Sequence, residues 1–269
     1  MRFLTRISTM DLKGKVALVS GGATGLGRTF CEELLRHGAK VSICDLDSDA
    51  GENAQKYLSE TFGKDRILFC HCDVTDYVQY EEAFQSTLAE FDGLDIVVNN
   101  AEIMNDKFWE LEVDVNLNGA IRGTLLGLQF MGRDKGGQGG VVVNIGSAAS
   151  FRPQVFSPPI YTATKHAILG LSRSCGDAYH YSTSGVRVIA LCPGLLCSEN
   201  GSAVPQNNKF KSPAHEKAWQ ADMKGVVPQS MEHVAKGLMT VIKEAASGSV
   251  WLIANGTPPK EIPFSHETL

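Results

Sequence analysis

Short apolar runs punctuate the chain at nearly regular intervals. Each run holds four to seven mostly apolar residues without polar alternation, which is typical of strands buried on both faces of a parallel sheet. Strands are predicted at 16–19, 40–45, 66–72, 95–101, 141–147, 186–192 and 249–253. None of these runs approaches the roughly 18 residues that a membrane span requires.

Between the runs, apolar residues recur at the three- and four-residue spacing of a buried helix face. Helices are predicted within 27–38, 54–62, 76–91, 107–131, 161–181 and 231–246. Strands that alternate with helices through short connections favour a parallel sheet with right-handed crossovers. We therefore expect an α/β fold, a single doubly wound Rossmann-type domain with a seven-stranded parallel sheet.

Three segments fall outside this alternation. Residues 1–10 carry two arginines and no acid, which resembles a short mitochondrial leader, but we expect a disordered extension instead. A single folded domain is predicted at 11–254, followed by a tail at 255–269 with three prolines. The apolar, irregular stretch 195–228 is interpreted as a substrate lid, and core packing of short helices is the alternative.

Composition narrows the functional classes. The chain of 269 residues is 43% hydrophobic and 20% charged, as in soluble globular proteins, and its net charge of -5 argues against a nucleic-acid surface. Seven scattered cysteines favour free thiols in a reducing, cytoplasmic compartment. Cys70 and Cys72 flank His71, but no second ligand pair follows at zinc-site spacing, so we expect no metal.

A glycine-rich turn joins the first predicted strand to the first predicted helix. Such a turn brings backbone N–H groups and the positive helix N-terminus close to a pyrophosphate. A dinucleotide site is therefore predicted here, and a glycine turn without a ligand is the alternative. Its residues are Gly21, Thr24, Gly25, Leu26 and Gly27.

The second predicted strand ends in Asp45, which lies 18 residues after Gly27. This is the expected place for a carboxylate that accepts a hydrogen bond from a ribose 2′-OH. A negative charge there repels a 2′-phosphate, so Asp45 favours NAD over NADP. A helix N-cap or a turn acid is the alternative interpretation of Asp45.

Ser147, Tyr161 and Lys165 combine a hydroxyl, a phenol and an ammonium near the end of the fifth predicted strand. Four residues separate Tyr161 from Lys165, so on a helix they share one face. A nearby ammonium lowers the pKa of a phenol, which then serves as a proton acceptor near neutral pH. Ser147 would orient the substrate oxygen.

These features together resemble the short-chain dehydrogenase/reductase family over about 12–254. The carriers are the turn beginning at Ser20, the Asn99-Asn100-Ala101 signature and the Tyr161-x-x-x-Lys165 pair. Within the family, stretches such as 107–110 and 248–251 resemble the branch of 15-hydroxyprostaglandin dehydrogenases and insect alcohol dehydrogenases.

The resemblance implies roles for further residues. Asn116 would complete a catalytic tetrad with Ser147, Tyr161 and Lys165, and would hold a water that links Lys165 to solvent. Asp73 would contact the adenine amine, and the segment from Pro193 to Ser198 would hold the nicotinamide carboxamide. Beyond the glycine turn, the implied cofactor site contains Asp45, Leu46, Asp73, Val74, Asn99, Ala101, Tyr161, Lys165, Pro193, Gly194, Leu196 and Ser198.

Three residues or spacings depart from the family pattern. Glu102 stands where the family has glycine, and a position with φ > 0 would be strained by about 1 kcal/mol. Ser147 precedes Tyr161 by 14 residues, one more than usual, and Ser150 is the less favoured substitute. Prolines at 158 and 159 replace a polar pocket residue, which argues against prostaglandin specificity.

The expected function is NAD-dependent oxidation of a secondary alcohol to a ketone by a short-chain alcohol dehydrogenase. The substrate is expected to be an apolar lipid, terpenoid or prostaglandin-like alcohol. An NADPH carbonyl reductase and a family member that binds without catalysis are the alternatives. The resemblance also implies a homodimer or homotetramer, paired through the helices near 107–131 and 160–181.

Overall fold

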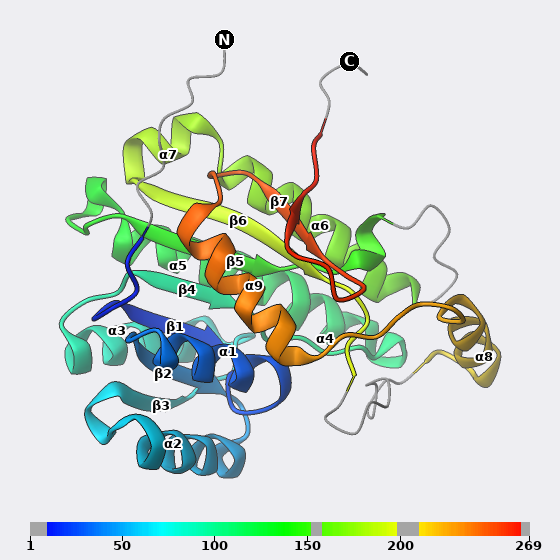
Figure 1. Cartoon of the computed structure of the whole chain (residues 1–269), viewed down its shortest axis with the longest axis horizontal. Coiled ribbons are helices and arrows are strands. Elements are labelled where there is room, and N and C mark those ends of the chain that lie inside the picture. Colours follow the sequence, from blue (N-terminus) through cyan, green and yellow to red (C-terminus); the bar gives the residue numbers. More distant parts are fainter. Residues whose placement is uncertain (1–9, 152–157, 198–209, 265–269) are drawn as a thin grey trace.

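The computed structural model describes residues 10–151, 158–197 and 210–264, and every structural statement below concerns these residues. A twisted sheet forms the centre and lies between two layers of helices (Figure 1). This arrangement confirms the predicted α/β, doubly wound class. Within the described residues, no helix is both long and apolar enough to cross a bilayer.

The sheet has eight strands in the order β3-β2-β1-β4-β5-β6-β7-β8. Their bounds are β1 Val16–Ser20, β2 Lys40–Asp45, β3 Ile67–His71, β4 Ile96–Asn99, β5 Gly140–Ile145, β6 Val186–Pro193, β7 Val250–Ile253 and β8 Lys260–Glu261. The first seven strands pair in parallel, as predicted. The predicted count of seven strands is wrong, because β8 pairs antiparallel with β7. This strand has only two exposed, polar residues and so lacks the apolar run by which the other strands were predicted.

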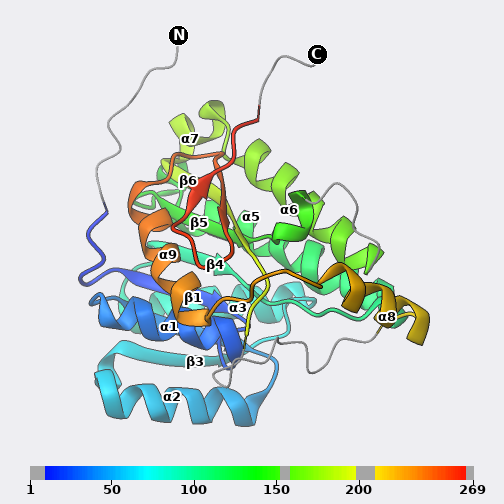
Figure 2. The same cartoon turned by 45° about the vertical axis from the view of Figure 1, so that its right-hand side comes forward.

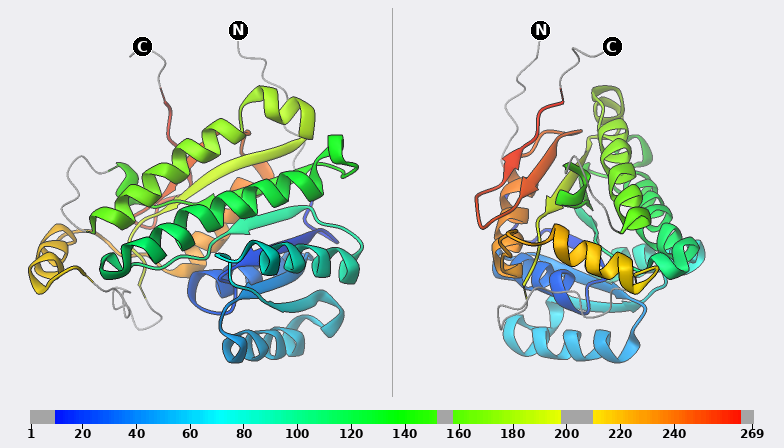
Figure 3. Two further views of the ribbon diagram at one scale, coloured as in Figure 1. Left: turned by 180° about the vertical axis from the view of Figure 1, so that it is seen from behind. Right: turned by 90° about the vertical axis from the view of Figure 1, so that its right-hand side faces the viewer.

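Helices cover both faces of the sheet, as the uninterrupted apolar strands require. On one face lie α1 (Gly25–Arg36), α2 (Ser48–Phe62) and α9 (Met231–Glu244), which bury their apolar sides against one core cluster. On the other lie α3 (Tyr77–Phe91), α5 (Ala120–Met131) and α6 (Pro159–Cys175), visible in front in the left view of Figure 3. The half-buried β3 and the exposed β8 form the two edges of the sheet.

Two predicted helices are divided in the structure. The stretch 107–131 consists of η2 (Asp106–Phe108), α4 (Trp109–Val113), the π-helical η3 (Asp114–Gly119) and α5. The stretch 161–181 breaks at Gly176, after which Asp177 caps a short α7 (Ala178–Ser184). A side chain at Gly176 would lie 2.3 Å from the backbone nitrogen of Gly248, so this glycine permits a close backbone contact.

The predicted irregular stretch 195–228 contains one helix among its described residues, α8 (Pro213–Asp222). This helix projects from the body on the side where the parallel strands end (Figure 2). It contributes no buried residue, although Trp219 packs its ring 5.5 Å from that of Phe210. Residues 198–209 of the predicted lid lie outside the described residues.

The order of the strands fixes where a ligand can bind. Connections run outward from β1 to β2 and β3, then cross back to β4 on the other side of β1. In doubly wound folds, ligands bind at the carboxyl ends of the strands beside this reversal. The glycine turn after β1 and the segments after β4 and β5 meet at this edge.

Candidate active site

The glycine turn closes tightly at the carboxyl end of β1. Gly21 and Gly25 have φ of 61° and 53°, and Thr24 is the N-cap of α1 without a side-chain capping bond. A Cβ at Gly27 would lie 1.9 Å from the carbonyl oxygen of Gly21, so no side chain fits there. By contrast, a Cβ at Gly25 would meet nothing within 4 Å, which leaves open space above the turn. This cradle fits a dinucleotide pyrophosphate.

Asp45 contacts this cradle directly from the end of β2. Its Oδ2 accepts from the backbone N–H of Ala23 at 3.0 Å, and its Oδ1 accepts from that of Asp47 at 3.1 Å. Asp47, rather than Asp45, is the N-cap of α2, so the N-cap interpretation of Asp45 is wrong. The carboxylate is anchored beside the predicted phosphate site, as an acceptor for a ribose hydroxyl requires.

The first turns of α6 carry Tyr161 and Lys165. The helix begins at Pro159, whose fixed φ suits the first helical position. Lys165 is only 2% exposed, and its Nζ donates to the carbonyl oxygen of Ile145 at 2.9 Å. The same Nζ lies 5.5 Å from the centroid of the Tyr161 ring, so the predicted pair does share one face.

Glu102 contacts both of these groups. Its Oε2 lies 2.5 Å from the Nζ of Lys165 and 3.4 Å from the phenol oxygen of Tyr161, which donates to it. Among the described non-glycine residues, only Asp92 and Asn255 have positive φ, so the strain considered for Glu102 does not arise. The carboxylate engages one of the three N–H donors of the Lys165 ammonium, and the carbonyl oxygen of Ile145 accepts from another.

The pKa of Tyr161 lies well above its ordinary value, contrary to the predicted lowering by Lys165. Burial is the largest cause, followed by the negative charge of Glu102, while a hydrogen bond with Ser147 opposes both. Lys165 is not among the main causes of this shift, and its ammonium is paired with Glu102. The phenol is therefore poised as a proton donor in this arrangement.

Ser147, two residues beyond the end of β5, faces Tyr161. Its hydroxyl accepts from the backbone N–H of Ala149 at 3.2 Å, and its proximity to the phenol opposes the rise in the pKa of Tyr161. Ser150 is buried in the following short η5 helix (Ala148–Phe151), and its hydroxyl meets no hydrogen-bond partner. The extra residue in the spacing thus does not displace Ser147 from the phenol.

Asn116 lies in the π-helical η3 and is 2% exposed. Its Oδ1 accepts from the N–H of Ile103 at 2.8 Å, and its Nδ2 donates to the carbonyl oxygen of Ile103 at 2.8 Å and to Thr164 Oγ1 at 3.4 Å. The amide therefore ties the segment that carries Glu102 to the helix that carries Tyr161. The predicted water-holding role of Asn116 stays a prediction.

The other predicted cofactor residues lie along the same edge of the sheet but differ in how far their side chains are exposed. Asp73 Oδ1 accepts from both the N–H and the hydroxyl of Thr75 in the turn after β3. Gly194 follows β6 and donates to the carbonyl oxygen of Ile253, and Leu196 packs on the core. Leu46 is exposed, Val74 is buried and Ala101 is half-buried. Ser198 lies outside the described residues.

Asn99 turns its side chain into the core rather than toward the site. Its Oδ1 accepts from the hydroxyl of Tyr80 at 2.9 Å, and its Nδ2 donates to Asn144 Oδ1 at 2.7 Å. A Cβ at Gly123 would lie 2.0 Å from the Asn99 Oδ1, so this glycine makes room for the network. Only the backbone of Asn99 can face a cofactor.

Asn100 and Ser20 hold the glycine turn in place and were absent from the predicted site. The Nδ2 of Asn100 donates to the carbonyl oxygens of Ser20 and Gly21, each at 3.0 Å. The Ser20 hydroxyl accepts from the N–H of Asn100 at 3.0 Å and of Ala101 at 3.2 Å. The doubled asparagine signature was the signal that could have identified Asn100.

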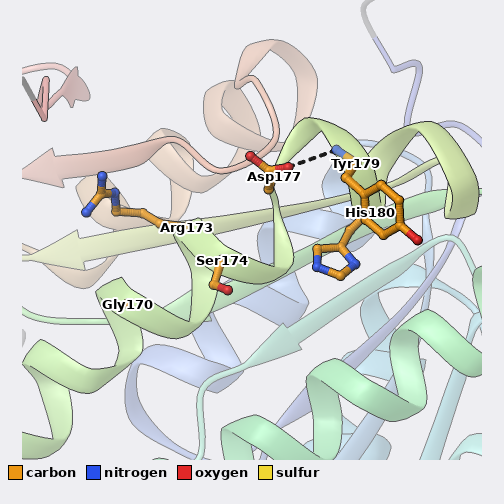
Figure 4. Close-up of a pocket in the computed structure, with 6 residues that line it drawn as sticks. All are labelled: Gly170, Arg173, Ser174, Asp177, Tyr179 and His180. Carbon is orange, nitrogen blue, oxygen red and sulfur yellow. Dashed lines mark hydrogen bonds between the residues drawn. The ribbon is translucent and has the colours of Figure 1, made fainter. Parts of the chain in front are cut away.

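A surface hollow of about 470 Å³ lies far from this edge, between α6 and α7. Figure 4 shows Tyr179 and His180 beside it and the carboxylate of Asp177 accepting from the Tyr179 N–H. Because α7 leads into the amino end of β6, the hollow lies at the opposite edge of the sheet from Tyr161. Across the described ranges, no group of acids, histidines and cysteines could hold a metal ion.

Comparison with known proteins agrees with this geometry. Residues 15–209 match the family model described as short chain dehydrogenase. The human 15-hydroxyprostaglandin dehydrogenase [NAD(+)] is 38% identical over 259 residues, which is 95% of each chain, and the mouse protein is equally similar. Alcohol dehydrogenase 2 of Ceratitis capitata is 30% identical over 94% of this chain and 96% of its own. The chain therefore belongs to the short-chain dehydrogenase family.

Proposed function

We propose that this protein is an NAD-dependent oxidoreductase that interconverts a secondary alcohol and a ketone. The observation that carries the proposal is the meeting of Ser147, Tyr161 and Lys165 at the edge where the glycine turn and Asp45 also lie. The names of the similar proteins, which are NAD(+)-dependent or alcohol dehydrogenases, support the same reaction class. The catalytic domain would span 11–254.

In this proposal, Tyr161 accepts the hydroxyl proton of the alcohol as its phenolate, and in the reverse direction its phenol donates that proton to the ketone, while Ser147 holds the substrate oxygen beside it. NAD, when bound, supplies the hydride acceptor. The glycine turn would hold its pyrophosphate, Asp45 its adenosine ribose, and Lys165 the ribose next to the reacting ring. For Lys165 to do so, its ammonium must leave the Glu102 carboxylate.

We propose an apolar alcohol of the lipid, terpenoid or prostaglandin-like class as the substrate. Support comes from α8, which projects at the same edge and packs the half-buried Trp219 against the buried Phe210. Because α8 buries none of its residues, core packing does not account for it, and we favour the interpretation of this stretch as a substrate lid. The prostaglandin activity in the name of the 38% identical relative makes that class the first to test.

The test is NADH formation, read by absorbance, from NAD and a panel of secondary alcohols. Tyr161→Phe should abolish turnover because it removes the proton acceptor. Tyr179→Phe is the matched control, since Tyr179 is 73% exposed on α7 and should leave the rate unchanged. Turnover that persists in the Tyr161 variant would overturn the assignment, and a comparison of NAD with NADP tests the reductase alternative.

One observation favours a second candidate, a family member that binds ligands without catalysis. Glu102 adds its negative charge to the larger effect of burial in raising the pKa of Tyr161, and it engages the ammonium proposed to bind the ribose. If the native protein is inactive with every alcohol but Glu102→Gly turns over, the binding function is favoured. If the native protein turns over, it is excluded.

We further propose a cytoplasmic homodimer or homotetramer. Phe108, Trp109, Leu111 and Leu125 are 50–61% exposed on and beside α4 and α5, where a second copy would cover them. Sedimentation of the purified protein tests the state. A monomer at micromolar concentration would contradict it.

A further inference from the structure

Two carboxyl groups that this mechanism does not use lie buried beside the catalytic helix. Asp106, in η2, is 3% exposed, and Glu112, in α4, is completely buried. Both elements contact α6, and Glu112 is one helical turn before Asn116. Acidic side chains are almost never fully buried unless they are paired. Each of these two carboxyl groups is therefore expected to bind a partner group.

Asp106 binds the start of the helix that carries Tyr161. Its two carboxylate oxygens accept from the backbone N–H groups of Ile160 and Tyr161, each at 3.4 Å. The N-cap residue of α6 is Pro158, whose side chain makes no capping bond, so these N–H groups have no local partner. A carboxylate at a helix N-terminus stabilises the helix, so Asp106 anchors the first turn of α6.

Glu112 has one carboxylate oxygen without a donor, and α4, which carries it, packs against η2, which carries Asp106. Its Oε1 accepts from the N–H of Asn105 at 3.0 Å, whereas its Oε2 meets no N–H or O–H donor among the described residues. Two ionised carboxylates cannot hydrogen-bond to each other, but one protonated group can donate to the other. Burial, above all, and the adjacent Asp106 raise the pKa of Glu112 to about 8.

We propose that Glu112 is a positioning residue for the catalytic tyrosine: its protonated carboxyl group donates to Asp106, which in turn holds the first turn of α6. The inference rests on the proposed role of Tyr161 as the proton acceptor. The chain of contacts runs from Glu112 through Asp106 to the Tyr161 backbone, without touching substrate. Glu112 thereby links the protonation of a buried acid to the placement of the phenol.

The charged groups around Glu112 set the direction of its pH effect. Asp106 faces it from η2, and Lys165 and Tyr161 face it from α6, with Lys165 favouring its ionised form. When Glu112 ionises, the hydrogen bond to Asp106 is lost and a second negative charge raises the pKa of Tyr161 further. Above about pH 8, the rate of alcohol oxidation should therefore increase with pH less steeply than it would if Glu112 stayed protonated.

The experiment compares kcat/KM against pH for the native enzyme, Glu112→Gln and Glu112→Ala. Glutamine retains a hydrogen-bond donor without a charge, so Glu112→Gln should keep kcat/KM at neutral pH within about twofold of the native value. Its pH profile should lack the change of slope near pH 8. Alanine removes the donor, so it should lower kcat about tenfold while the NAD KM changes little. Glu110→Gln, on the exposed side of the same α4, is the control and should not change the profile.

Infrared titration of the folded native protein supplies a readout without turnover. A protonated carboxyl band should titrate near pH 8 and be absent from Glu112→Gln. The proposal is overturned if that band is missing at pH 7, or if Glu112→Ala keeps the native rate and profile. Absence of turnover with every alcohol would overturn the proposed function instead, because the infrared band would still report on Glu112.

Discussion

The carboxylate of Glu102 lies 2.5 Å from the ammonium of Lys165, at the centre of the candidate active site. Lys165 is almost fully enclosed, whereas the Glu102 side chain is 42% exposed. The ion pair therefore closes the buried lysine off from the solvent side of the site. A cofactor ribose and this carboxylate would compete for the same ammonium hydrogens.

Removing the charge of Glu102 should shift the pH dependence of alcohol oxidation to lower pH. The Glu102 charge raises the pKa of Tyr161, so Glu102→Gln lowers that pKa and increases the phenolate fraction at a given pH. Each unit of pKa lowering raises that fraction about tenfold on the acidic limb. The measurement is kcat/KM from pH 6 to 10.

The same substitution should tighten cofactor binding. Lys165 would regain one charge-assisted hydrogen bond, worth about 1.5 kcal/mol or about tenfold in Kd. Fluorescence titration with NADH measures this change, and Glu82→Gln on the exposed side of α3 is the control. Weaker binding in Glu102→Gln would mean that Glu102 contacts the ribose instead of competing with it.

Asp45 should decide between the two dinucleotides. Asp45→Ser removes a negative charge that repels a 2′-phosphate and an acceptor for the ribose hydroxyl, so NAD affinity should fall about tenfold while NADP affinity rises. The ratio of the two Kd values is the measurement. Asp49→Ser, exposed in the first turn of α2, should leave that ratio unchanged. An unchanged ratio in Asp45→Ser would remove Asp45 from the ribose site.

The sequence predicted those features of the fold and the site that depend on residues close together in the chain. Apolar runs predicted all seven parallel strands, and glycines at 21 and 27 predicted a turn that no larger residue could form. The four-residue spacing placed Tyr161 and Lys165 on one helix face. Each of these inferences depends on neighbours within one or two turns of chain.

Relationships between distant segments could not be predicted in the same way. The partner of Lys165 is Glu102, 63 residues earlier by number, and the helix N-terminus at Tyr161 is bound by Asp106. Glu112 was not identified from the sequence, because its burial depends on how α4 packs against α6. The π-helical turn around Asn116 has no compositional signature, since any residue can occupy it.

Arg187 should contribute to stability rather than to catalysis. It is buried in β6, and its guanidinium donates to the carbonyl oxygens of Ala245 and Ile242 at the end of α9. Arg187→Met leaves both carbonyls without their donors and should cost about 3 kcal/mol of unfolding free energy. Urea unfolding measures the loss. Lys236→Met, exposed on α9, should cost less than about 0.5 kcal/mol.

Glu112 should make the folded protein less stable as the pH rises. Its pKa is raised from 4.5 to about 8 in the folded state, mainly by burial, so the folded protein holds a proton that the unfolded chain releases. The stabilising contribution is complete below about pH 4.5 and is lost as the pH rises through about 8. Urea midpoints between pH 5 and 9 should fall more steeply for the native protein than for Glu112→Gln, with Glu110→Gln following the native slope. Parallel slopes for all three proteins would show that Glu112 is ionised in the folded state at neutral pH, and that its buried oxygen is satisfied by something other than a shared proton.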